Sequence, residues 1–136
     1  MYLADTDLVS EPRRKRPNPK VLQWLRDHDH ELFLSAITIG EIKKGVVLYP
    51  DGRKKEELTV WLRGLLEDFD ESVLPFTLAE ALVWGELYAK AQRAGRKPPG
   101  LDSLNAAIAL RHGFTLVTRN EADYLASGVK IFNPWK

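Results

Sequence analysis

Five short apolar runs alternate with segments of helical character along the chain, and this alternation restricts its fold more than any other feature. The runs cover residues 2–4, 32–34, 73–76, 115–118 and 129–132. Strands that are separated by helices pair in parallel and need a helical layer on each face of the sheet. The sequence therefore predicts an α/β fold, a three-layer α/β/α sandwich with a central parallel sheet of four to five strands. A chain of 136 residues is long enough for one such domain over 1–136.

Local signals place the helices between these runs. Asn18 and Pro19 form a helix start, and Thr77 with Glu80 forms a capping box. Gly113 ends an alanine-rich helix that begins near residue 101. The T-x-x-E pattern of Thr38 and Glu41 likewise predicts a helix start at Thr38. Pro75 within the third run indicates an edge strand.

The composition excludes several classes of protein. The formal net charge is +1, so any nucleic-acid binding must depend on local patches of charge. The chain has no cysteine, which excludes disulfides, thiolate metal sites and a cysteine nucleophile. It has neither the pattern of a signal peptide nor an apolar window of the ~20 residues that span a bilayer. We expect a soluble cytoplasmic protein without a membrane segment.

Acidic residues recur at one topological position. Asp5 and Asp7 follow the first run, Glu41 begins the helix after the second, Asp102 begins the helix before the fourth, and Asp123 follows the fourth. Sites in parallel α/β sheets form beyond the carboxyl ends of the strands, so these carboxylates should converge. Their mutual repulsion would be relieved by a hard divalent cation such as Mg²⁺ or Mn²⁺, which takes oxygen ligands. Such an ion can activate water against a phosphodiester.

Each acid also has a purely structural interpretation. Asp5 and Asp7 could bond the backbone of a turn, and Glu41 could serve only in the capping box with Thr38. Asp102 and Asp123 could be acids favoured near helix starts. Taken singly these positions are weak signals, and their shared placement carries the prediction of a site.

Basic residues near the acidic segments are candidates for contacts with a phosphate backbone. They are Arg13, Arg14, Lys15, Arg16, Lys43, Lys44, Arg96, Lys97 and Arg119. The alternative for the run at 13–16 is a solvated loop.

The segments LADTDLVSE, LSAITIGEIKKGV, GLDSLNAAIALRHGFTLVTRNEADY and VKIFNPW, in this order, resemble the PIN-domain family. Within that family they are most similar to the VapC-type ribonuclease toxins, including the FitB-like branch. The resemblance spans essentially the whole chain. It implies a type II toxin that cleaves single-stranded RNA with Mg²⁺ or Mn²⁺, forms homodimers and is inhibited in a hetero-oligomer by a cognate, VapB-like, DNA-binding antitoxin.

The family's acidic positions fall on four residues of this chain. The resemblance assigns metal binding and catalysis to Asp5, Glu41, Asp102 and Asp123, and accessory polar positions to Thr6, Asp7, Thr118 and Asn120. Two positions depart from the family pattern, because asparagine is usual at Asp7 and an apolar residue at Asn105.

Two other interpretations of the opening DTD remain open. DTDLV also matches the nucleophile loop of haloacid-dehalogenase-like phosphatases, in which Asp5 would be the nucleophile and Asp7 the general acid. That match lacks the later lysine and the acidic pair directly after a strand. The second alternative is a catalytically silent module with the same fold that only holds a partner.

Overall fold

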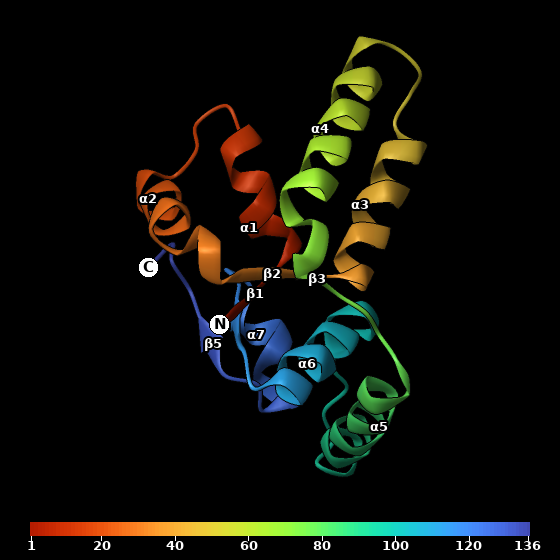
Figure 1. The fold of residues 1–136 in the computed structure, drawn as a ribbon. Coiled ribbons are helices and arrows are strands. Elements are labelled where there is room, and N and C mark those ends of the chain that lie inside the picture. The colour runs from red at the N-terminus through yellow and green to blue at the C-terminus, as the bar shows by residue number, and fades with distance from the viewer.

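A parallel sheet of five strands forms the centre of the computed structural model, which describes residues 1–136 (Figure 1). The strands are β1 (Tyr2–Ala4), β2 (Leu32–Ser35), β3 (Val73–Leu74), β4 (Thr115–Val117) and β5 (Ile131–Phe132). Their order across the sheet is β3-β2-β1-β4-β5, and every pair is parallel. β3 is an edge strand, as Pro75 predicts, but it ends at Leu74, so the proline follows the strand instead of lying within it.

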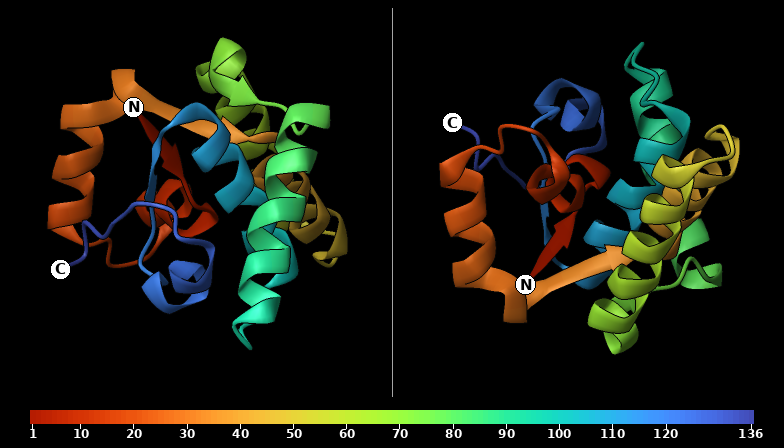
Figure 2. Two further views of the ribbon diagram at one scale, coloured as in Figure 1. Left: turned by 90° about the horizontal axis from the view of Figure 1, so that it is seen from below. Right: turned by 90° about the horizontal axis from the view of Figure 1, so that it is seen from above.

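Helices cover both faces of the sheet, which confirms the predicted α/β/α sandwich. They are α1 (Thr6–Ser10), α2 (Pro19–His28), α3 (Ala36–Leu48), α4 (Arg53–Phe69), α5 (Leu78–Arg93), α6 (Gly100–His112) and α7 (Glu121–Tyr124). Helices α1 to α4 lie on one side and α5 to α7 on the other, and α3 and α4 form a long hairpin that projects from the body (Figures 1 and 2). Short 3₁₀ turns cover Glu11–Arg13, Asp29–Glu31, Asp70–Ser72 and Leu125–Ser127. None of the helices combines the length and apolar character needed to cross a membrane.

The alternating side chains of the strands supply two separate hydrophobic clusters. Ala4, Leu34 and Val117 pack under α1 to α4, whereas Leu3 and Leu116 pack against the helices of the opposite face. Successive residues of a strand point to opposite faces, so each central strand contributes to both clusters. The central strands are thus buried on both faces, and their carboxyl ends are held in fixed positions.

Several local signals act as the sequence predicts. The Asn18 side chain accepts hydrogen bonds from the backbone N–H groups of Lys20 and Val21 at the start of α2. Thr77 and Glu80 form the expected capping box. Gly113 ends α6 in the left-handed conformation, with φ of 69°.

The predicted start of the third helix is wrong. α3 begins at Ala36, and the hydroxyl of Ser35 accepts the hydrogen bond from the backbone N–H of Thr38 at 3.0 Å. Glu41 therefore lies in the second helical turn and plays no part in a capping box. The turn around the first acids is also replaced by a helix, because Asp5 caps the short helix α1 and Asp7 lies within it.

Candidate active site

The acidic corner, defined as Asp5, Glu41, Asp102 and Asp123, gathers at the carboxyl edge of the three central strands. Asp5 directly follows β1, and Glu41 lies on α3 after β2. Asp102 begins α6, which leads into β4, and Asp123 lies on α7 after β4. Because β2, β1 and β4 are neighbours in the sheet, segments far apart in sequence meet at one edge.

Asp5 is the most firmly held member of the acidic corner. Only 7% of its surface is exposed. One carboxylate oxygen accepts from the backbone N–H of Thr6 at 2.8 Å, which caps α1. The other accepts from the hydroxyl of Thr118 at 2.8 Å, which ties the end of β4 to the end of β1. The two bonds fix the rotamer of Asp5 and leave little freedom for this carboxylate.

Asp102 is oriented by a residue that the sequence analysis did not single out. The buried phenol of Tyr124 donates a hydrogen bond of 3.1 Å to a carboxylate oxygen of Asp102. Burial, followed by the negative charges of Asp5 and Asp102, raises the pKa of Tyr124, so its phenol remains a protonated donor. The tyrosine follows Asp123 directly in the motif NEADY, and this adjacency was the only signal for it.

The carboxylates of the acidic corner lie close enough to raise one another's pKa. Burial and the nearby Asp7 raise the pKa of Asp5. Burial, with the charges of Asp102 and Asp5, raises the pKa of Glu41, although Lys44 opposes this. Burial and the charge of Asp5 likewise raise the pKa of Asp102, with Asp123 adding to the effect. The corner is an anionic cluster that gains stability from protons or from a cation.

The donor set fits a hard divalent cation. No three acidic or histidine side chains are close enough in their present positions to hold one ion directly. An ion that keeps part of its water shell, as Mg²⁺ does, can be held by one or two carboxylates directly and by the others through water. All four side chains offer only carboxylate oxygens, which are the preferred ligands of Mg²⁺ and Mn²⁺.

The accessory residues connect Asp5 to Asp7. The hydroxyl of Thr118, which donates to Asp5, also accepts from the backbone N–H of Asn120 at 3.0 Å. The Asn120 amide in turn donates to the Asp7 carboxylate at 2.9 Å. The Thr6 hydroxyl is buried and makes no hydrogen bond. Asp7 therefore closes a chain of contacts along the edge between β1 and β4.

A second buried network supports the corner from behind. Asn105 is 1% exposed, and its side-chain oxygen accepts from the hydroxyl of Ser35 at 2.5 Å. Its amide donates to the hydroxyl of Thr38 at 3.4 Å. These bonds join α6, which carries Asp102, to α3, which carries Glu41. The polar residue inside the run LNAAIAL was the sequence signal for this role.

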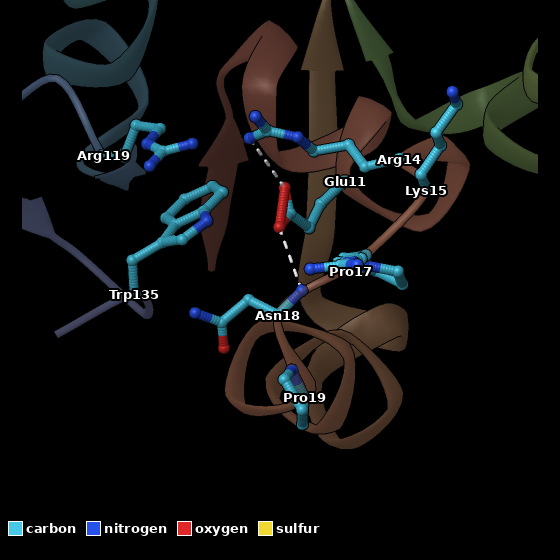
Figure 3. A pocket seen from close by; sticks show the side chains of 9 residues that line it. Glu11, Arg14, Lys15, Pro17, Asn18, Pro19, Arg119 and Trp135 are labelled. Carbon is cyan, nitrogen blue, oxygen red and sulfur yellow. Dashed lines mark hydrogen bonds and ion pairs between the residues drawn. The ribbon is translucent and has the colours of Figure 1, made fainter.

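The structure separates the predicted basic candidates. Arg14, Lys15, Arg16 and Arg119 line one cavity of about 890 Å³, together with Glu11, Pro17, Asn18, Pro19 and Trp135 (Figure 3). We call this the basic cavity. Arg13 instead lies over the ring of Trp61, 4.9 Å from its centre. Lys43 and Lys44 are exposed on α3, and Arg96 and Lys97 line a smaller cavity beside Asp123.

Comparisons with known proteins agree with this architecture. Residues 2–126 match the PIN domain family. Three curated relatives align over 99–100% of this chain and 99% of their own length: the plasmid stability protein StbB of Pseudomonas syringae at 39% identity, the toxin FitB of Neisseria gonorrhoeae at 36%, and the VapC ribonuclease Y4jK of Sinorhizobium fredii at 34%.

Among solved structures, that of FitAB bound to an IR36 DNA fragment superposes with a TM-score of 0.93 at 35% identity. The match covers 100% of this chain and 96% of the other. Fold, sequence and the order of the acidic motifs therefore agree. The chain belongs to the PIN domain family, in the branch of the VapC- and FitB-type toxins.

Proposed function

We propose that the protein is a toxin that acts as a divalent-metal-dependent endoribonuclease on single-stranded RNA. The observation that carries this proposal is the acidic corner, in which burial and mutual repulsion raise the pKa of Asp5, Glu41 and Asp102. Asp5 and Asp102 have hydrogen-bond donors, but no cationic side chain pairs with either of them. The relative from Sinorhizobium fredii, a VapC ribonuclease, supports the choice of RNA as substrate.

In this proposal Asp5 and Asp102 bind Mg²⁺ or Mn²⁺ directly or through water, with Glu41 and Asp123 completing the site. The bound ion would supply an activated water and stabilise charge on the scissile phosphate. Thr118 and Tyr124 hold the carboxylates of Asp5 and Asp102 in place. Such outer hydrogen bonds fix the orientation of ligands and strengthen metal sites. The expected products carry 5′-phosphate and 3′-hydroxyl ends.

The direct test is cleavage of single-stranded RNA by the purified protein with Mn²⁺, with Mg²⁺ and with EDTA. Cleavage should require the metal and should be lost in Asp5→Asn protein that still unfolds at the wild-type temperature. Metal-independent cleavage, or wild-type cleavage by Asp5→Asn, would refute the mechanism.

We also propose that the protein works in a hetero-oligomer with a cognate DNA-binding antitoxin in the cytoplasm, and as a homodimer. The similarity to FitB in the FitAB complex with DNA supports a partner of this kind. Large apolar side chains are exposed on the α3–α4 hairpin, among them Val47, Leu48 and Val60, and offer surface for such contacts. Co-purification with the product of a neighbouring gene tests this proposal.

The phosphatase interpretation loses its support. The Asp5 carboxylate accepts hydrogen bonds from Thr6 and Thr118, and neither is the lysine that this chemistry needs. The Asp7 carboxylate is engaged with Asn120, and Asp5 shares its edge with Glu41 and Asp102, which a phosphatase would not use. A phosphomonoester assay beside the RNA assay separates the two activities. Absence of both activities would favour the silent binding module.

A further inference from the structure

The basic cavity has two walls that come from opposite ends of the chain. One wall is the loop from Arg14 to Asn18, between α1 and α2. The other wall is formed by Arg119, just after β4, and by Trp135 beyond β5. Figure 3 shows Arg119 and Trp135 on one side of the cavity, with Arg14 and Lys15 on the other. The lining contains four cationic side chains and a single acid, Glu11, so the cavity favours an anion.

Glu11 fixes the shape of the loop wall. Its side chain is only 4% exposed, although it lies in a polar loop. One carboxylate oxygen accepts from the backbone N–H of Asn18 at 3.1 Å, and the other pairs with the guanidinium of Arg14 at 3.4 Å (Figure 3). The buried acid thus holds both ends of the loop, and the cationic side chains project from a backbone that is already ordered.

Arg119 and Trp135 lie together on the opposite wall, and we call this pair the ledge. The guanidinium of Arg119 lies over the indole ring, 5.2 Å from its centre. Trp135 packs against the hydrophobic cluster under α1 to α4, and its backbone N–H donates to the Asn133 side chain at 2.9 Å. Its ring is therefore held from the protein side, and the Arg119 side chain that lies over it is exposed.

This ledge adjoins the acidic corner. Arg119 lies between Thr118, whose hydroxyl bonds to Asp5, and Asn120, whose amide bonds to Asp7. The backbone of residues 118–120 therefore connects the cavity to the carboxylates that hold the metal in the proposed function.

We propose that the basic cavity binds the nucleotide that flanks the scissile phosphate of the RNA. Its base stacks on the Arg119–Trp135 ledge, and its phosphates face Arg14, Lys15 and Arg16. Proteins recognise unpaired RNA bases by stacking on aromatic rings and on arginine planes, while a basic groove follows the backbone. Bases in a duplex have no free face for such stacking, so the ledge accounts for a preference for single strands. This inference rests on the proposed ribonuclease function and assigns a specific role to Trp135 and Arg119.

The test measures the affinity for a fluorescein-labelled, short single-stranded RNA in EDTA, so that no cleavage occurs. Arg119→Ala should weaken binding about tenfold, on the scale of one stacked base. Arg119→Lys keeps the charge but not the plane, and it should lose most of the same affinity. Trp135→Phe keeps an aromatic face and should stay within about threefold of wild type. Arg93→Ala, on the exposed side of α5, is the matched control and should bind as wild type does.

An abasic nucleotide moved stepwise along the RNA distinguishes stacking from simple charge. At the position whose base stacks on the ledge, the abasic nucleotide should weaken binding to wild type about tenfold. The same abasic nucleotide should not weaken binding to Arg119→Ala any further, because that variant has already lost the stacking contact. Equal abasic effects in both proteins, or full affinity in Arg119→Lys, would overturn the stacking proposal. Hexaglutamate and an unlabelled RNA serve as competitors. If hexaglutamate displaces the labelled RNA at as low a concentration as the unlabelled RNA does, the cavity is a site for an acidic peptide and the stacking proposal is overturned. Wild-type cleavage with unchanged binding by Arg119→Ala refutes only this inference, whereas failure of wild type to cleave RNA refutes the proposed function.

Discussion

The acidic corner and the basic cavity are neighbours, yet they handle buried charge in opposite ways. Asp5 is a buried carboxylate surrounded by other acids, and its pKa is raised by burial and by Asp7. Glu11 is a buried carboxylate of the cavity, and it has a guanidinium and a backbone N–H as partners. Both carboxylates accept hydrogen bonds, but only Glu11 has a cation beside it, and a buried charge that lacks a counter-charge costs stability.

The comparison indicates a division of roles. In the proposed function the corner keeps its acids unneutralised so that they can bind a cation, and stability is lost as a result. The cavity uses its only acid to order a loop and leaves its cations exposed for an anionic ligand. Substitutions in the acidic corner and at Glu11 test this division of roles, and their expected effects range from large to small.

Asp5→Asn should lower the rate of metal-dependent RNA cleavage by about 100-fold or more, because a carboxylate central to the metal site is removed. The amide keeps an oxygen that can accept from Thr6, so the fold should persist. Cleavage rates in Mn²⁺ and thermal unfolding in EDTA measure the two effects. A variant that is inactive because it is unfolded would not support the role of Asp5.

Glu11→Ala should lower the free energy of unfolding by about 1–3 kcal/mol, because the backbone N–H of the half-buried Asn18 loses its acceptor. Urea denaturation gives this value. Glu11→Gln keeps an acceptor oxygen and should lose clearly less stability. If the alanine variant has the same midpoint as wild type, the loop does not depend on Glu11, and the contrast with Asp5 fails.

Tyr124→Phe should weaken metal binding about tenfold, because Asp102 loses the donor that orients it. The metal concentration that gives half-maximal RNA cleavage measures this effect. The ring remains, so the packing around residue 124 should be preserved and the unfolding temperature should change little. An unchanged metal requirement would show that the phenol only fills space.

Asp102→Asn should stabilise the metal-free protein at pH 7, since burial and the charge of Asp5 raise the pKa of Asp102 above its ordinary value of 3.8. The aspartate is charged at pH 7 and destabilises the fold, and it becomes neutral as the pH falls through its raised pKa. The difference in unfolding temperature between variant and wild type should therefore shrink toward pH 4. A difference that does not depend on pH would mean that charge repulsion is not its source.

Asp7→Asn should change cleavage the least, by less than about threefold. The asparagine carbonyl can still accept the hydrogen bond from Asn120, and Asp5 and Asp102 lose only a neighbouring charge. Rates measured beside those of Asp5→Asn test the different weights of the two acids. Complete loss of cleavage would place Asp7 among the essential residues.

The fold was largely predictable because its signals are local. Asn18, Gly113 and the Thr77–Glu80 pair each act on the backbone within a few residues. The start of α3 was misplaced because Ser35 and Thr38 are both suitable caps, and tertiary contacts decide between them. Thr38 is buried under Asn105, a partner 67 positions away.

The acidic corner could be predicted from the strand order, whereas its supporting contacts could not. Asp5, Glu41, Asp102 and Asp123 all follow from the rule that parallel strands share one carboxyl edge. Tyr124 orients Asp102 only because its phenol points toward that carboxylate. Trp135 lines the basic cavity only because its ring lies opposite the loop from Arg14 to Asn18. Neither direction can be predicted from spacing along the chain.

The bond between Thr118 and Asp5 spans 113 positions and has a consequence for timing. A ribosome adds about 5–20 residues per second, so Asp5 waits roughly 6–23 seconds for its partner to be made. During that interval the chain carries the first acid without the edge that completes the corner. The corner therefore cannot assemble before the fourth strand has been synthesised, and in the proposed function an antitoxin need only meet the finished fold.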